Sequence, residues 1–390
     1  MDKKIKLAII GASYLQEPLI QKAKERGIET HVFAWAAGDV GEKSADYFYP
    51  ISIIDKEEIL AKCQEIGIDG ICSIASDLAV ITVNYVAEKM GLIANPNECV
   101  MNATNKHNMR LCFAAHNCPS PKSIQIHSMA DLDGIELAYP VIVKPVDRSG
   151  SRGITKLNSR VGLEEAVVRA IDYGFEKVAL IEEYAVGQEY SVEYISWEGQ
   201  HHFLAMTKKY TTGEPNFIEM GHIEPAPVSE STLAQVKQVV EKALDSLGVK
   251  YGASHSELKI SEDGEIKLIE IGARMGGDFI GSSLVELSTG YDFVGGVIDV
   301  ALGIEPRVNR IKSSIAAIRF IFNEEDVKAF ELLKAEHPEM IIASDINEVT
   351  DEVPVDSSSR FGYYLYSGKE LTMIKKYLPK EVEEKTIHKL

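Results

Sequence analysis

The sequence predicts a mixed fold, with an α/β region at the N-terminus and α+β regions after it. Three observations predict this fold. Strand and helix patterns alternate over residues 1–100, which is typical of a parallel sheet with helices on both faces. Two strand patterns joined by a short polar turn occupy residues 251–278. Shorter strands and helices follow residue 307 and predict a small C-terminal α+β segment.

Composition and charge restrict the class of protein. A chain of 390 residues is long enough for two or three domains, and a net charge of −18 argues against a nucleic-acid or anionic-membrane partner. No apolar run is long enough for a membrane span, and the first one is too short for a signal peptide. Five cysteines, an odd number without C-x-x-C spacing, indicate a reduced cytoplasmic setting.

The N-terminal region begins with a β–α–β pattern. Strands are expected at 6–10, 29–35, 51–53 and 70–74, and helices at 17–27, 56–66 and 77–90. Only Gly11 of a G-x-G-x-x-G pattern is in place, which disfavours a dinucleotide site. Ligands of parallel sheets bind beyond the carboxyl ends of the strands, so loops 11–14 and 75–77 are candidates for substrate contact. The alternative is that these loops serve only as turns and helix caps.

The next region contains basic residues in unusual positions. Lys106 and Arg110 lie one helical turn apart in a helix expected at 97–115, and such a pair usually faces solvent. Lys144 lies inside an apolar strand at 139–145, where a buried ammonium group is costly unless it meets an anion. The glycine- and serine-rich residues 146–153 can donate backbone N–H groups to phosphate, although the order of a Walker A loop is absent. The alternative is an exposed edge-strand lysine before a linker.

The remaining patterns complete the expected elements. Strands are expected at 178–184, from 187 onward, and at 201–210, 314–323, 340–343 and 362–367. Helices are expected at 163–173, 229–247, 279–289, within 290–306, and at 325–334 and 369–377. The apolar stripe of 229–247 indicates a role in the core.

The hairpin at 251–278 is the most informative segment. Its strand patterns place Glu257 and Glu270 near one another if the arms pair antiparallel around the polar turn 261–264. Two carboxylates inside a sheet repel each other and resist desolvation, and a divalent cation such as Mg²⁺ removes both costs. Arg274 follows and suits the capture of phosphate or carboxylate. The alternative is a surface hairpin with scattered charges.

Together these segments resemble the ATP-grasp superfamily, in its carboxylate–amine ligase or L-amino-acid ligase branch. Glu257 followed by Glu-Ile-Gly-Ala-Arg at 270–274 is similar to the metal-binding E…E-x-N-x-R signature, with Gly272 where many members have a metal-binding Asn. The run YPVIVKPVDRSGSRG is similar to the strand lysine and glycine-rich flap of that family. The resemblance implies a Rossmann-like pre-ATP-grasp domain at 1–100, a two-part ATP-grasp domain at 101–186 and 187–306, and an α+β tail at 307–390.

The resemblance also implies cofactors and site residues. ATP and Mg²⁺, with Mn²⁺ as an alternative ion, are the implied cofactors, and Glu257 and Glu270 would hold the metal. Arg274 would hold the substrate carboxylate and the transferring phosphoryl group, and His222 would act catalytically in the substrate cavity, although a lone histidine is more often structural. The implied nucleotide-binding residues are Lys106, Lys144, Ser149, Gly150, Ser151, Gly153, Glu182, Glu183, Tyr184, Ala185 and Glu189.

Among the nucleotide-binding residues, Glu182 would meet the adenine amino group and 183–185 would give backbone contacts. Glu189 would accept the ribose hydroxyls, for which a carboxylate is a good acceptor. The alternative is surface acidity on a strand pair.

The implied function is ATP-dependent amide formation between a small carboxylate and an amine, with amino acids as the expected substrates. An acyl phosphate would be the intermediate, and ADP and phosphate would be released. The alternatives are a bicarbonate-activating or purine-pathway ligase of the same superfamily, and a nucleotide-binding module without catalysis. The sequence specifies neither the two substrates nor the oligomeric state, and a homodimer stays open.

Overall fold

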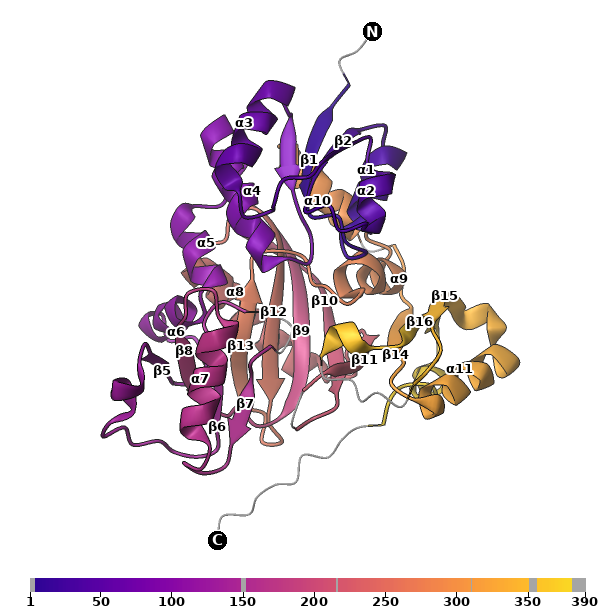
Figure 1. Cartoon of the computed structure of the whole chain (residues 1–390). Coiled ribbons are helices and arrows are strands. Elements are labelled where there is room, and N and C mark those ends of the chain that lie inside the picture. The colour runs from indigo at the N-terminus through magenta and orange to yellow at the C-terminus, as the bar shows by residue number, and fades with distance from the viewer. Residues whose placement is uncertain (1–3, 149–151, 215–216, 310, 351–355, 381–390) are drawn as a thin grey trace.

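The structure is a computed structural model that describes residues 4–148, 152–214, 217–309, 311–350 and 356–380. It has three lobes, with the N-terminal sheet at the top of Figure 1 and two further lobes below it. A parallel sheet and two antiparallel sheets form these lobes, which confirms the predicted mixed fold. No helix within the described ranges is long and apolar enough to cross a bilayer.

The N-terminal sheet has four parallel strands in the order β3 (Tyr47–Tyr49), β2 (Glu29–Phe33), β1 (Lys6–Ile10) and β4 (Gly70–Cys72). Its helices are α1 (Glu17–Glu25), α2 (Val40–Ser44), α3 (Lys56–Ile66) and α4 (Asp77–Met90). The strand expected at 51–53 is wrong, because the edge strand runs over the preceding aromatic residues. Tyr47 and Tyr49 stack on His31 of β2 at 4.9 and 5.9 Å between ring centroids, and this packing fixes the edge.

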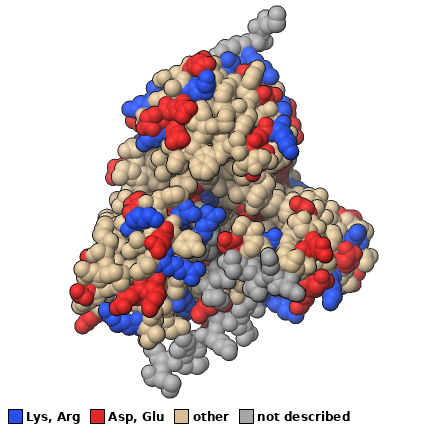
Figure 2. All heavy atoms as spheres, in the orientation of Figure 1, with Lys and Arg blue, Asp and Glu red and all other residues tan. Residues whose placement is uncertain are grey.

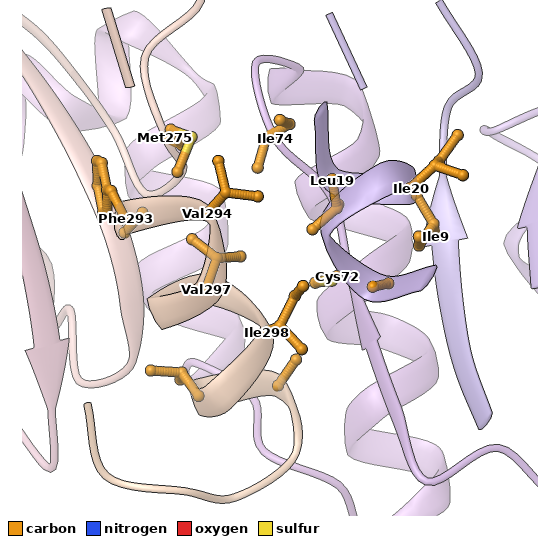
Figure 3. Close-up of a cluster of buried hydrophobic side chains, with 14 of the residues drawn as sticks. Ile9, Leu19, Ile20, Cys72, Ile74, Met275, Phe293, Val294, Val297 and Ile298 are labelled. Atoms are coloured by element: carbon orange, nitrogen blue, oxygen red, sulfur yellow. The ribbon is translucent and has the colours of Figure 1, made fainter. Parts of the chain in front are cut away.

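One face of the N-terminal sheet is covered by a helix from far along the chain. Helix α10 (Phe293–Ala301) packs beside α1 in one buried cluster. Figure 3 shows Val297 and Ile298 of α10 beside Leu19 of α1, with Met275 and Ile74 in the same cluster. The N-terminal sheet therefore shares its core with residues 275–301.

The helix expected at 97–115 is two helices, α5 (Asn97–Thr104) and α6 (Lys106–Ala115), so the prediction of one continuous helix is wrong. Asn105 has an extended backbone, and its side-chain oxygen accepts the N–H groups of His107 and Asn108 at 3.0 and 3.1 Å. This cap begins a new helix and places Lys106 in its first turn.

The second sheet lies in the lower left lobe of Figure 1 and has the order β5 (Ser123–Ile126), β8 (Ala179–Glu183), β6 (Val141–Pro145) and β7 (Thr155–Leu157). Helix α7 (Leu163–Tyr173) packs on it, with the short 3-10 helix η1 (Met129–Leu132) before β6.

The described C-terminal strands form no sheet of their own, because they extend the eight-stranded third sheet. Its order is β13 (Ile266–Gly272), β12 (Gly252–Ile260), β9 (Gln188–Trp197), β10 (Gln200–Thr211), β11 (Glu219–Glu224), β14 (Ile315–Phe320), β16 (Gly362–Gly368) and β15 (Ile341–Ile346).

Helices connect and cover this third sheet. The longest, α8 (Glu230–Leu247), buries Val236, Val240 and Leu244 against it, which confirms the core role predicted from its apolar stripe. The helix expected at 279–289 begins with one π-helical turn. The other helices of this part are η2 (Ile280–Leu284), α9 (Val285–Thr289), α11 (Glu324–Glu336), η3 (Pro338–Met340), η4 (Ser357–Ser359) and α12 (Leu371–Lys375).

Candidate active site

A cleft of about 190 Å³ lies between the second and third sheets. Figure 2 shows the surface hollowed where the lobes meet, with Lys and Arg side chains at the margin on the lower left lobe. Ten of the predicted site residues line this cleft. They are Lys106, Lys144, Glu182, Glu183, Tyr184, Ala185, Glu189, Glu257, Glu270 and Arg274.

One wall of the cleft is rich in cations. Lys144 Nζ lies 2.6 Å from one oxygen of Glu182, and Arg110 Nε lies 2.8 Å from the other. Burial and the neighbouring cations lower the pKa of Lys144 even though Glu182 raises it. Burial raises the pKa of Glu182, but Arg110 and Lys144 outweigh burial and hold it below its usual value. Both carboxylate oxygens of Glu182 thus face cations, and its contact with adenine stays a prediction.

Lys106 joins this cation-rich wall to the hairpin. Its ammonium donates to Glu270 and to the carbonyl oxygen of Arg148, each at 2.8 Å. Burial lowers the pKa of Lys106, but Glu270 outweighs burial and raises it. The cap at the start of α6 is what brings Lys106 here, with its backbone N–H donating to Val146 at 2.9 Å.

The opposite wall is acidic and is built around Lys209 of β10. Its ammonium lies 2.7 Å from Glu257, 3.0 Å from Glu189 and 3.4 Å from Glu219. Burial lowers the pKa of Lys209, but the three carboxylates raise it well above its usual value. Lys209 and Glu219 were missed from the sequence. Lys209 follows Lys208 at the polar end of β10, so it lacks the signal of Lys144, which is a lysine within an apolar strand.

Glu257 of β12 lies directly opposite Glu270 of β13, which confirms that the hairpin brings them close, and a β-bulge between Glu257 and Leu258 sets this pairing. Burial raises the pKa of Glu257, but Lys209 and His255 outweigh burial and hold it well below its usual value. The two carboxylates lie beside different lysines, because Glu257 accepts from Lys209 and Glu270 accepts from Lys106.

His255 also lines the cleft and was not among the site residues predicted from the sequence. Its Nε2 lies 3.3 Å from Glu257, and its Nδ1 pairs with the fully buried Glu193 of β9. Burial lowers the pKa of His255, but Glu193 outweighs burial and raises it to about 9. Glu193 also accepts the N–H of Gly276 at 3.2 Å, which ties β9 to the segment after Arg274.

Arg274 contacts the N-terminal domain. Its Nε and Nη2 donate to the two oxygens of Asp77 at 2.8 and 3.1 Å. Burial raises the pKa of Asp77, but Arg274 outweighs burial and lowers it. Burial lowers the pKa of Arg274, but Asp77 outweighs burial and raises it.

The carboxylates fit a magnesium ion only together with phosphate. Mg²⁺ is commonly held by one or two carboxylates plus substrate phosphates, and Glu257 and Glu270 are such a pair. Within the described ranges, no group of three or more His, Cys, Asp or Glu side chains is arranged to hold a metal by itself. Phosphate oxygens and water would therefore complete the coordination.

Five predicted residues do not line the described cleft. His222 is fully buried beside Phe320, and no described group hydrogen-bonds to either ring nitrogen. Burial lowers its pKa to about 3, so the ring is neutral near pH 7. Gly153 packs against Tyr173 and Pro145 with a positive φ of 72°. Ser149, Gly150 and Ser151 lie outside the described residues.

Comparisons with known proteins agree with this geometry. Residues 137–282 match the family described as an ATP-grasp domain. Alanine–anticapsin ligase of Bacillus subtilis strain 168 is 26% identical over 245 residues, covering 57% of this chain and 51% of that protein. D-alanine–D-alanine ligase of Ralstonia nicotianae is 24% identical over 277 residues, covering 68% and 77%. The chain spans little more than half the length of the alanine–anticapsin ligases that it matches, 51% to 58%.

Solved structures share the fold over nearly the whole chain. L-amino acid ligase from Bacillus licheniformis superposes with a TM-score of 0.81 and 24% identity, covering 97% of this chain and 96% of that one. Phosphoribosylglycinamide synthetase from Anaerococcus prevotii superposes with a TM-score of 0.75 and 19% identity, covering 96% of each chain. At these identities the likeness is one of fold.

Proposed function

We propose that this protein is an ATP-dependent ligase that joins a small carboxylate to an amine, because residues 137–282 match the ATP-grasp domain family. Amino acids are the proposed substrates, because several of the matched relatives are amino-acid ligases by name. The observation that carries the proposal is the pairing of Glu257 with Glu270 at a cleft that also holds Lys144 and Arg274.

The proposed reaction has two steps. A substrate carboxylate oxygen attacks the γ-phosphorus of ATP, the bond to the bridging oxygen breaks, and ADP leaves. The amine nitrogen then attacks the acyl carbon, inorganic phosphate leaves, and the nitrogen loses a proton as the amide forms. ATP supplies the phosphoryl group that makes the carboxylate reactive, so the protein needs no nucleophile of its own.

The residues of the cleft are proposed to bind and orient. Lys106 and Lys144 would neutralise the phosphates. Their ammonium groups are buried, so they need little further desolvation when an anion binds. Glu257 and Glu270 would hold Mg²⁺, and Arg274 would hold the substrate carboxylate and the transferring phosphoryl group.

The rest of the nucleotide is proposed to bind to residues 182–189. Glu182 would contact the adenine amino group, 183–185 would give backbone contacts, and Glu189 would accept the ribose hydroxyls. The units 1–100, 101–186, 187–306 and 307–390 are the proposed domains. A catalytic role for His222, a cytoplasmic location and a homodimer are further parts of this proposal.

The first test is phosphate release from ATP and Mg²⁺ with every pair of the standard amino acids, followed by mass spectrometry of each active pair. We expect release that requires two particular amino acids and yields the mass of their dipeptide. Release with one carboxylate alone would place the amine outside this set. Confirmed ATP binding with no release for any pair would contradict the amino-acid ligase.

The metal assignment is tested by Glu270→Gln, which should abolish turnover in a folded protein because it removes half of the carboxylate pair. Glu265→Gln is the matched control, since Glu265 lies exposed at the start of the same hairpin arm. Normal turnover in a well-folded Glu270→Gln variant would refute the assignment.

A further inference from the structure

Asp77 and Arg274 meet across the boundary between two lobes. Asp77 is the first residue of α4 in the N-terminal lobe, and Arg274 follows β13 of the large sheet. They are 197 positions apart in sequence, and they pair through two donors and two acceptors. A two-point contact between an arginine and a carboxylate fixes both planes, so this pair orients the guanidinium as well as neutralising it.

The Asp77–Arg274 pair crowds the space beside Gly272. Gly272 has no positive φ, so the backbone there does not require glycine. A Cβ atom at this position would lie 3.0 Å from Oδ1 of Asp77 and 3.1 Å from Nε of Arg274. A longer side chain at 272 and the Asp77–Arg274 pair therefore compete for the same volume.

The segments that carry Asp77 and Arg274 are both bonded to the buried core that joins the lobes. The N–H of Ala75 donates to the carbonyl oxygen of Met275 at 3.2 Å, so the loop before Asp77 is bonded to the residue after Arg274. Met275 and Ile74 belong to one buried cluster, as Figure 3 shows. Ala75 has a φ of 57°, an unusual conformation for a residue with a side chain, and this contact holds it there.

The arrangement leaves part of the guanidinium free for a ligand. Nε and Nη2 donate to Asp77, and Nη1 donates to the carbonyl oxygen of Met275 at 3.2 Å. An arginine side chain has five N–H bonds, so one on Nη1 and one on Nη2 are not used by these contacts. Arg274 lines the cleft, where these two donors can serve an anion.

We propose that Asp77 is a positioning residue, by which the N-terminal lobe fixes Arg274 for its anionic ligand and takes the volume that a side chain at 272 would fill. The inference rests on the proposed function for the identity of that ligand, a substrate carboxylate or a transferring phosphoryl group. It assigns the 75–77 loop a part in the reaction without direct contact with substrate. Docking of the N-terminal lobe thereby becomes a condition for an ordered Arg274.

The test compares Asp77→Asn with the wild-type protein on an active substrate pair. We expect kcat to fall by about 10²-fold, because a shift of about 1 Å in a group that orients the reactants costs about that much, while the KM for ATP stays within about threefold. Asp55→Asn is the matched control, since Asp55 precedes α3 in the same lobe, is exposed and makes no capping hydrogen bond. Unchanged kcat in Asp77→Asn, or an equal loss in Asp55→Asn, would overturn the proposal.

The competition for volume gives a second, independent readout. Gly272→Asn alone should lower kcat because it displaces the pair. In the combined variant, Asp77→Ala with Gly272→Asn, the fold-loss of kcat should be at least about tenfold smaller than the product of the two single fold-losses. This is expected for groups that share one space. Losses that simply multiply would overturn the proposal. Circular dichroism and melting of each variant separate these effects from failure to fold.

Failure of the proposed function is distinguishable from failure of this inference. If the wild-type protein releases no phosphate with any pair, the function fails first. A double-mutant cycle on unfolding, with Asp77→Asn and Arg274→Lys, then tests the pair itself. Additive changes in that cycle would refute the pairing on which the inference depends.

Discussion

Lys144 and Lys209 are both buried lysines in strands, yet they sit in opposite electrostatic surroundings. Lys144 shares the single carboxylate Glu182 with Arg110, and burial lowers its pKa. Lys209 lies within 3.4 Å of three carboxylates, which raise its pKa well above its usual value. Lys144 thus has only one carboxylate, shared with Arg110, beside its ammonium group, whereas Lys209 has three.

This difference in charge indicates the sign of the ligand that each wall would bind. A wall of desolvated cations gains most from an anion such as a nucleotide phosphate, and a wall of carboxylates gains most from a cation such as Mg²⁺. The two walls meet at the hairpin, where Lys106 contacts Glu270 and Lys209 contacts Glu257. A bound metal–phosphate pair would satisfy both walls at once.

The largest expected effect comes from removing the cation of the acidic wall. Lys209→Met leaves three partly buried carboxylates without their common partner, so the free energy of unfolding should fall by about 3–5 kcal/mol. Urea unfolding measures this, and added Mg²⁺ should restore part of the loss. Lys208→Met on the same strand is the control. An equal loss in both variants would show that Lys209 does not organise this wall.

Removing the cation of the other wall should act on ligand binding more than on folding. In Lys144→Met, Glu182 still faces Arg110 at 2.8 Å, so unfolding should change less than in Lys209→Met. Affinity for MgADP should fall by about 1.5–3 kcal/mol, the usual range for a hydrogen bond to a charged group. Isothermal titration calorimetry checks this, with the exposed Lys122→Met as control. Unaltered affinity would remove Lys144 from the nucleotide site.

Acid should destabilise the fold through the buried ring of His222, which lies beside the acidic wall. Burial, then Lys209, holds the pKa of His222 at about 3, below its value in an unfolded chain. The unfolded chain therefore takes up a proton first, and stability is lost as pH falls from about 6.5 towards 3, by up to about 1.4 kcal/mol per pH unit. His222→Phe should reduce this slope in urea unfolding between pH 6.5 and 5, and His31, His107 and His201, whose pKa values are also lowered, account for a remaining part.

Retention of the full slope in His222→Phe would contradict a neutral buried ring. Turnover of the same variant tests the proposed catalytic role, which requires a loss of kcat at neutral pH.

The smallest effect concerns Tyr184, at the end of β8, where the two lobes below the N-terminal sheet approach each other. The ammonium groups of Lys156 and Lys259 lie 3.7 and 4.9 Å from the centre of its ring. Tyr184→Leu removes the ring and should lower the free energy of unfolding by about 0.5–1 kcal/mol for each of these cation–π interactions. Tyr184→Phe keeps the ring and should stay near wild type. Equal losses in both variants would assign the effect to the hydroxyl.

Local signals allowed much of the cleft to be predicted. Lys144 stands out as a charge within an apolar strand, and one antiparallel hairpin brings Glu257 near Glu270. The sequence did not reveal the β-bulge at Glu257, without which Ile269 would stand opposite Glu257. Lys209 follows Lys208 at the polar end of its strand, so it lacks the signal that marks Lys144. Asn105 carries an N-cap signal that would have divided the helix expected at 97–115, and the neighbouring apolar periodicity hid it.

Other features depend on contacts that no local pattern reveals. Asp77 and Arg274 are 197 positions apart, and Glu193 and His255 are 62 apart, so their pairing follows only from how the lobes and strands assemble. The C-terminal strands gave no sign that they extend the large sheet, because an edge strand and a separate small sheet have the same alternation.

The return of α10 to the N-terminal sheet has a consequence for synthesis. The strands at 6–10, 29–33 and 70–72 leave the ribosome first, while the face that Val294 and Ile298 cover waits for residues 293–301. At about 5–20 residues per second, the intervening chain of roughly 200 residues takes about 10–40 s to make. During that interval the nascent sheet presents an apolar face, which favours association with other apolar surfaces.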